Sequence, residues 1–258
     1  MFNMVDCNPV STPMESGLVL THHTDTLTCQ EELDLQDLPY HRLVGLLMYL
    51  TIATQPDIAF AICKLSQFMN YYCIIHWNAA KQVVHYLKGT CTLQLRLGGK
   101  NPSKLMGFCD ASYACCPDSG KSIGTFSLSG GVISWALRKQ KTVAQSTCDA
   151  EYIACSEATC ECMWLQMLTS EINMLQPHPT PLLMDNEAAL ALAKDLHFHA
   201  CAKHINTHWH CIHECIDNSD IYISYVNTTD NVANILTKLL PSPAFLYLHS
   251  FLGLCNVP

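Results

Sequence analysis

From residue 105 onward, the apolar residues of this chain alternate between the spacing of β-strands and that of α-helices. Short apolar runs predict the strands, and Ser129-Gly130-Gly131 predicts a hairpin turn between two of them. The expected strands span residues 105–109, 124–128, 132–135, 182–184 and 221–226. Three successive strands followed by alternating helices and strands predict a mixed α/β layer fold.

Helical spacing fills the intervals between the later strands. Ser146 followed by Asp149 resembles a capping box, which predicts the start of a long helix with its alanines roughly on one side. Asn186 is expected to cap the next helix. The later helices are expected to span residues 187–194, 203–216 and 231–238.

Three acidic residues stand at boundaries of these elements. Asp110 ends the first strand run, Glu151 lies in the early turns of the long helix, and Asp185 follows the strand at 182–184. Residues just past the carboxyl ends of strands converge at one edge of an α/β sheet, so these side chains are expected to meet if the helix crosses nearby. They would then bind Mg²⁺, a hard cation that prefers carboxylate oxygens. The alternative is that Asp110 and Asp185 are ordinary turn and cap residues.

The first hundred residues follow a different pattern. Residues 1–39 are rich in proline, threonine and acidic residues, and they predict an extended lead-in. Residues 40–100 predict a small helical module, which leaves residues 101–258 as the α/β domain. The three expected helices of the module begin at Tyr40, Ile58 and Trp77. Gly89 is expected to close the third helix.

Composition restricts the function. The net charge is −8, and the chain has only three arginines beside 13 histidines and 16 cysteines. Because phosphate binding depends on lysine and arginine, this balance argues against tight nucleic-acid binding. The chain has neither an apolar stretch long enough for a bilayer nor a signal-peptide pattern in its first ten residues. The protein is therefore expected to be soluble and intracellular, in the cytoplasm or the nucleus, with reduced cysteines.

A segment rich in histidine and cysteine suggests a second kind of metal site. His204, His208, Cys211 and Cys215 share one face of a predicted helix, as zinc ligands could. Their spacing fits no closed zinc-finger pattern, and a zinc-binding regulatory protein stays an alternative. Gly120-Lys121-Ser122 is no phosphate loop, because Cys115 stands where the first glycine should be.

Ordered motifs run along nearly the whole chain. The earlier ones are Asn8-Pro9-Val10-Ser11-Thr12-Pro13-Met14, Tyr40-His41-Arg42-Leu43-Val44-Gly45, Pro56-Asp57-Ile58-Ala59-Phe60-Ala61 and Tyr86-Leu87-Lys88-Gly89-Thr90. The later ones are Asp110-Ala111-Ser112-Tyr113, Ile133-Ser134-Trp135, Ala150-Glu151-Tyr152-Ile153-Ala154, Asp185-Asn186 and Lys203-His204-Ile205. Together they resemble the C-terminal part of the polyprotein of copia-type long-terminal-repeat retrotransposons. The earlier motifs resemble the end of the reverse transcriptase with its thumb-like helices, and the later ones resemble the ribonuclease H domain.

The resemblance implies a fold and an activity. The fold would be ribonuclease H-like, with a mixed five-stranded sheet flanked by helices and preceded by a helical thumb-like module. The activity would be cleavage of the RNA strand of an RNA–DNA hybrid with two Mg²⁺ ions, or with Mn²⁺ in their place. Asp110, Glu151 and Asp185 are the implied metal ligands, and Asn234 and His204 are the other implied catalytic positions. The chain contains no Asp-Asp pair like that of a polymerase palm, so no polymerase activity is expected.

Asn234 departs from the family pattern. The family has aspartate at this position of the motif Ala233-Asn234-Ile235-Leu236-Thr237-Lys238, and the amide removes a negative charge beside one metal position. Five further positions have lost the Arg or Lys that is usual in the family, and they are Gln82, His85, Cys201, His208 and His213. These differences leave an alternative function: a catalytically inactive remnant, or a nucleic-acid-binding module without enzymatic activity.

Overall fold

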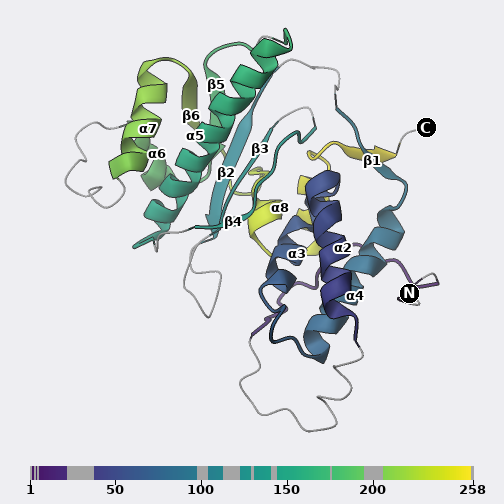
Figure 1. The fold of residues 1–258 in the computed structure, drawn as a ribbon. Coiled ribbons are helices and arrows are strands. Elements are labelled where there is room, and N and C mark those ends of the chain that lie inside the picture. Colours follow the sequence, from purple (N-terminus) through teal and green to yellow (C-terminus); the bar gives the residue numbers. More distant parts are fainter. Residues whose placement is uncertain are drawn as a thin grey trace.

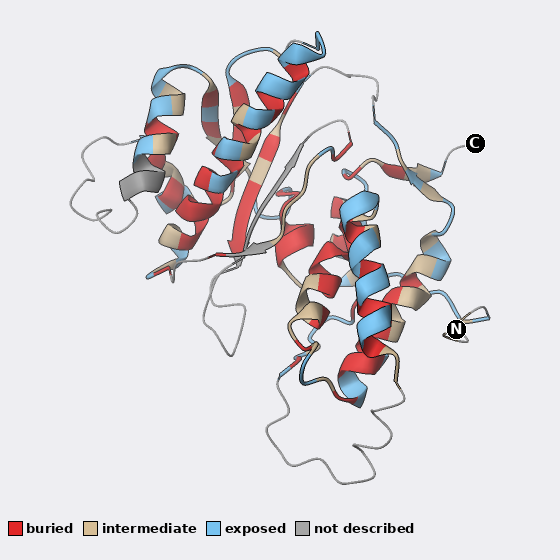
Figure 2. Ribbon diagram, viewed as in Figure 1, coloured by how far each residue is buried: buried red, intermediate tan, exposed pale blue. Residues whose placement is uncertain are grey.

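The computed structural model describes residues 2, 4, 6–21, 38–97, 104–112, 123–128, 131–140, 144–174, 176–194 and 206–256. A sheet divides the molecule, with one group of helices on each side of it (Figure 1). Figure 2 shows buried residues where each group of helices faces inward, and exposed residues on its outer side. Among the described helices, none combines the length and the apolar composition needed to cross a bilayer.

The sheet has five strands in the order β4-β3-β2-β5-β6. They are β2 (Gly107–Ser112), β3 (Ile123–Leu128), β4 (Arg138–Lys139), β5 (Thr180–Met184) and β6 (Ile221–Tyr225). Strands β2, β3 and β4 pair antiparallel, whereas β5 pairs parallel with both β2 and β6. The predicted mixed α/β architecture, a five-stranded sheet flanked by helices, is confirmed.

The long helix α5 (Thr147–Glu171) packs across β2 and β3. Its start is the predicted one, because the Ser146 side chain accepts a hydrogen bond from the Asp149 N–H at 3.1 Å. Ala150, Ala154 and Ala158 are fully or almost fully buried, so small side chains bring this helix close to the sheet. The helices that contact α5 on the same side are α6 (Glu187–Lys194) and α7 (Asn206–Asp217).

Asn186 caps α6 as expected, since its Oδ1 accepts a hydrogen bond from the Ala189 N–H at 3.0 Å. The expected start of α7 at residue 203 lies outside the described residues. This side of the sheet buries one hydrophobic core, to which Cys109 of β2, Tyr152 of α5 and Ile223 of β6 contribute.

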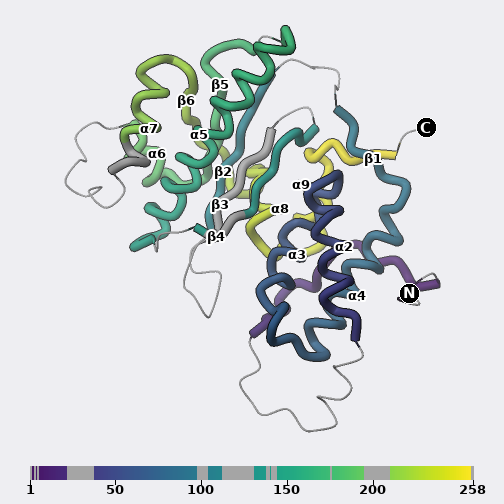
Figure 3. Tube along the Cα trace, viewed as in Figure 1, coloured from purple at the N-terminus to yellow at the C-terminus, as the bar shows by residue number. Residues whose placement is uncertain are grey.

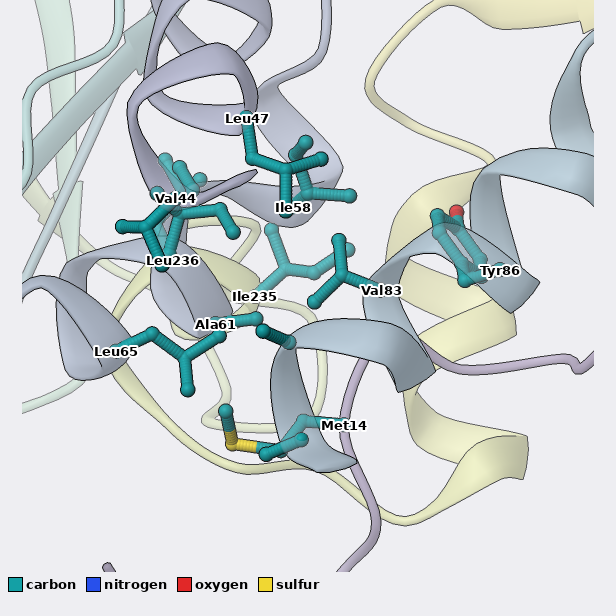
Figure 4. Packing of buried hydrophobic residues seen from close by; sticks show 14 of the residues in the cluster. Met14, Val44, Leu47, Ile58, Ala61, Leu65, Val83, Tyr86, Ile235 and Leu236 are labelled. Atoms are coloured by element: carbon teal, nitrogen blue, oxygen red, sulfur yellow. The ribbon is translucent and has the colours of Figure 1, made fainter. Parts of the chain in front are cut away.

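Helices from both ends of the chain form the other side. They are α2 (Tyr40–Ala53), the short 3-10 helix η1 (Pro56–Ile58), α3 (Ala59–Ser66), α4 (Ile74–Thr90), α8 (Asn234–Thr237) and α9 (Ser242–His249). Figure 3 traces the yellow C-terminal chain among the purple and blue N-terminal helices. In Figure 4, Ile235 and Leu236 of α8 lie among Val44, Ala61 and Val83 in the second hydrophobic core. Residues at both ends of the sequence therefore share one core.

Two short strands join the same two parts of the chain. Strand β1 (Leu93–Leu95) pairs antiparallel with β7 (Leu254–Asn256). Next to this pair, the Arg96 N–H donates to the Gly253 carbonyl at 2.8 Å, and the Val132 N–H donates to the Leu252 carbonyl at 3.1 Å. Three chain segments thus meet in one tight crossing.

Gly131 makes this crossing possible. It has a φ of 134°, and a Cβ added to it would lie 2.4 Å from the Arg96 carbonyl oxygen. Gly131→Ala is therefore expected to lower the free energy of unfolding by about 2–4 kcal/mol, because both the backbone angle and the close contact oppose a side chain. Chemical denaturation monitored by circular dichroism measures this change.

Gly45→Ala is the matched control. Gly45 lies inside α2 with nothing within 4 Å of an added Cβ, so alanine is expected to stabilise the helix by about 0.5–1 kcal/mol. If both substitutions changed the free energy of unfolding by the same amount, the close packing of the chain around Gly131 would be contradicted.

Several expected element boundaries are wrong. Residues 132–135 form no strand, and the third strand is β4. Val132 and Trp135 instead pack on the second core, where the Trp135 indole N–H donates to the Thr51 carbonyl at 2.6 Å. Helix α4 continues past Gly89 to Thr90, and the helix expected at 231–238 is only the single turn α8. The prediction that Asp110 ends its strand is also wrong, since β2 continues to Ser112.

Candidate metal centre

The register of the sheet brings Asp110 and Asp185 to the same level. Phe108 of β2 is opposite Leu183 of β5 in a parallel pair, so the positions two residues further on are also side by side. Asp110 is fully buried within β2, and the Asp185 side chain, directly after β5, is 7% exposed. The two residues lie side by side as expected, although Asp110 is inside strand β2 and not at its end.

Glu151 joins them from helix α5. It is the fifth residue of the helix, and its side chain is buried, with 6% of its surface exposed. Asp110, Glu151 and Asp185 each offer a carboxylate oxygen, and these oxygens all lie within 4.8 Å of one another. We call these three residues the acidic cluster. It is the only such group of three or more potential ligands among the described residues.

Burial and mutual repulsion change the acidity of the cluster. Burial, together with the neighbouring charges of Asp110 and Asp185, raises the pKa of Glu151 to about 9. A hydrogen bond from the Ala111 backbone and the charge of Lys238 act in the opposite direction. Burial also raises the pKa of Asp110, which Lys238 and Thr237 counteract. Glu151 Oε2 is buried and has no hydrogen-bond partner among the described residues. Such an atom is costly unless it gains a proton or a cation.

Helix α8 approaches Asp110 from the other side of the sheet. The Thr237 hydroxyl donates to Asp110 Oδ2, and the Lys238 ammonium donates to Asp110 Oδ1 at 2.9 Å. Lys238 Nζ also lies 3.9 Å from Asp185 Oδ2. Because side chains alternate along a strand, Asp110 shares a face of β2 with Phe108, which packs on the core that contains α8.

Thr237 and Lys238 are site residues that the sequence motifs did not predict. The available signal was their spacing, because they follow Asn234 by three and four residues and such residues share one helix face. A single-turn helix next to the cluster therefore places all three together.

Asn234 lies beside the cluster and is satisfied without a metal ion. It is buried, its Nδ2 donates to the Thr228 carbonyl at 2.6 Å, and its Oδ1 accepts a hydrogen bond from Lys238. Nearby, buried Asn231 donates to the Cys109 carbonyl at 3.0 Å, which fixes this loop to β2. His204 lies outside the described residues.

The five positions at which the resemblance implies Arg or Lys lie elsewhere, as far as the structure describes them. Gln82 and His85 of α4 bond to the backbone carbonyls of Thr12 and Asn8, at 3.3 and 2.6 Å. His213 of α7 is buried. Cys201 lies outside the described residues, as does the side chain of His208.

The zinc alternative is tested only in part, because His204 and the His208 side chain lie outside the described residues. In the described part, Cys211 of α7 contacts a cysteine of another helix, with its Sγ 3.9 Å from that of Cys160 on α5.

The residues of the acidic cluster fit a hard divalent cation. Three carboxylates converge on one point, and the buried Glu151 Oε2 there still has an open lone pair. Oxygen ligands of this kind are those that Mg²⁺ and Mn²⁺ prefer. The room for a second ion is set by the neutral amide of Asn234 and the positive charge of Lys238, which lie next to Asp110.

Comparisons with known proteins give relatives that match nearly the whole chain. No family model matches the chain. The chain is 36% identical over 255 residues to the retrovirus-related Pol polyprotein from transposon TNT 1-94 of Nicotiana tabacum, covering 98% of this chain and 19% of the polyprotein. It is 34% identical over 259 residues to the Pol polyprotein from transposon RE2 of Arabidopsis thaliana, covering 99% of this chain and 17% of the polyprotein. The chain thus spans less than a fifth of the length of these relatives.

Among solved structures, the chain is similar to a ribonuclease H1, LC11, isolated from compost. The TM-score is 0.40 and the sequence identity 14%, and the match covers 52% of this chain and 93% of that one.

Proposed function

Because this chain belongs to the Pol polyprotein family of copia-type retrotransposons, we propose that residues 101–258 form a ribonuclease H-like nuclease domain. Its reaction would be hydrolysis of the RNA strand of an RNA–DNA hybrid. Residues 1–39 and 40–100 would be the remnant of a reverse transcriptase, an extended segment and a thumb-like helical module. The proposal includes an intracellular place of action, in the cytoplasm or the nucleus.

The observation that carries the proposal is the convergence of Asp110, Glu151 and Asp185 from two strands and a helix. Carboxylates repel one another, and a fold that buries three of them together loses stability unless something compensates. A divalent cation is the compensation that also serves phosphodiester hydrolysis. When bound, it supplies positive charge for the phosphate and lowers the pKa of water.

The residues of the site would bind the cation and the phosphate of the hybrid. Asp110 is held in place by Thr237 and Lys238, so its carboxylate needs no reorganisation when the hybrid binds. Glu151 and Asp185 would complete the ligand set. The Lys238 side chain is 34% exposed, so its ammonium is also accessible to a phosphate of the hybrid.

One observation favours the alternative of an inactive remnant or a binding module. Both polar atoms of the Asn234 amide already bond within the protein, to Thr228 and Lys238, so this position is stable without a metal ion. The net charge of −8 also weakens attraction to a hybrid. Activity is therefore expected to be low.

A cleavage assay tests the proposal. Purified protein, a hybrid with labelled RNA, and Mg²⁺ or Mn²⁺ are expected to give RNA fragments that chelation abolishes. Asp185→Asn is the matched negative control, because it removes one ligand charge with almost no change in volume. If wild-type protein is as inactive as Asp185→Asn with both Mg²⁺ and Mn²⁺, the enzymatic proposal is overturned. The alternative of an inactive remnant or binding module then stands.

A further inference from the structure

Lys238 places its ammonium group next to two members of the acidic cluster, 2.9 Å from Asp110 Oδ1 and 3.9 Å from Asp185 Oδ2. We infer that this ammonium takes the place of one of the two ions that the family resemblance implies, so that the chain binds a single divalent cation. The inference rests on the proposed metal centre, but it concerns the number of ions bound and not cleavage.

The position of Lys238 follows from the end of helix α8. Its backbone N–H donates to the Asn234 carbonyl at 2.9 Å, so the two residues lie one helical turn apart. Their side chains therefore share a face, and the ammonium bonds to Asn234 Oδ1 as well as to Asp110 Oδ1. The ammonium thus lies between the amide and the buried carboxylate.

Hydrogen bonding inside the cluster restricts where a metal ion fits. Both oxygens of Asp110 already accept hydrogen bonds, one from Thr237 and one from Lys238. Glu151 Oε2 is the buried atom that has no hydrogen-bond partner among the described residues, and Asp185 has only the longer contact to Lys238. Asp110 therefore has fewer lone pairs left for a metal ion than Glu151 and Asp185, because each of its oxygens already accepts one hydrogen bond.

The charge balance leads to the same number of ions. When ionised, the three carboxylates contribute three negative charges, and Lys238 leaves two of them uncompensated. One divalent cation neutralises that remainder, whereas a second one would be repelled by both the first ion and the ammonium. Asn234 cannot change the balance because its amide is neutral.

An aspartate at position 234 would change the partner of Lys238. It would give the ammonium a carboxylate one turn away on the same helix face, a spacing at which opposite charges pair. Lys238 would then hold Asp110 less strongly, and the cluster would regain the charge that a second ion requires. The neutral amide at position 234 is therefore what directs the ammonium to Asp110.

Titration of the folded protein with Mn²⁺ tests the inference, with free Mn²⁺ measured by electron paramagnetic resonance. Wild-type protein is expected to bind one ion per chain. Lys238→Met should bind its ion about tenfold more tightly, because a competing positive charge is gone, while Lys238→Arg should behave like wild type. Asn234→Asp should bind two ions. Circular dichroism confirms that each variant is folded.

The outcomes separate this inference from the proposed function. Two ions per wild-type chain, or equal affinity in Lys238→Met and wild type, would overturn the role of Lys238 and leave the metal centre standing. Absence of Mn²⁺ binding by folded wild-type protein, at concentrations where Asn234→Asp also binds none, would overturn the metal centre itself. If Lys238→Met fails to fold, the numbers of ions bound by wild type and by Asn234→Asp still test the inference, because one and two ions are expected, respectively.

Discussion

Asn234→Asp is expected to raise the rate of Mg²⁺-dependent hybrid cleavage by about tenfold to a hundredfold over wild type. The substitution restores a carboxylate beside the acidic cluster and turns a neutral acceptor of the Lys238 ammonium into a charged one. The cluster gains one negative charge, and Asp110 becomes freer to bind a metal ion. Initial rates measured at several Mg²⁺ concentrations would show a higher maximum and a lower half-saturating concentration.

Asn218→Asp is the matched control for this gain. Asn218 is exposed in the turn after α7, so the substitution gives the same net charge without changing the cluster. Its cleavage rate should equal that of wild type. If Asn218→Asp and Asn234→Asp had the same effect, the gain would come from net charge or folding and not from the site.

Glu151→Gln is expected to have opposite effects on metal binding and on stability. Loss of a buried ligand should abolish the rise in melting temperature that Mn²⁺ causes. In the absence of metal, the variant should be more stable than wild type at pH 7–8 by about 1–3 kcal/mol. At this pH the Glu151 carboxyl is ionised in the unfolded chain and must take up a proton on folding, whereas the glutamine amide does not. Chemical denaturation with and without Mn²⁺ measures both effects.

The sign of the pH dependence follows from the pKa of Glu151. Burial raises this pKa to about 9 from an ordinary value of 4.5. The stability that wild type owes to the protonated carboxyl is therefore fully present below pH 4.5, where the unfolded chain is protonated as well. As pH rises, the unfolded chain ionises first and wild type loses stability until about pH 9. The advantage of Glu151→Gln should therefore grow across this interval. Glu157→Gln, at an exposed position of the same helix, should show no such growth.

Local interactions explain which elements could be predicted. The Ser146 and Asn186 caps depend on hydrogen bonds that span only three residues, so the sequence alone contains the whole signal. The strand predicted at residues 132–135 was wrong because an apolar segment indicates burial and not a particular secondary structure. Val132 and Trp135 are drawn to a core built from helices far away in the sequence.

Long-range packing explains what was missed. Strands β1 and β7 have three residues each, and only their partner across the chain makes them strands. At the site, the convergence of Asp110 and Asp185 could be predicted because β2 and β5 are parallel neighbours, although Asp110 lies inside β2 and not at its end. The contact of Lys238 with Asp110 could not, because it depends on how α8 is packed against β2, across 128 residues of sequence.

The most direct test is a crystal structure of the protein with Mn²⁺, in which anomalous scattering locates the ions independently of any activity. We predict one peak among the carboxylates of Asp110, Glu151 and Asp185, with the Lys238 ammonium still against Asp110. A well-ordered cluster with no anomalous peak, or with the three carboxylates pointing apart, would contradict the claim that these residues form one cation site.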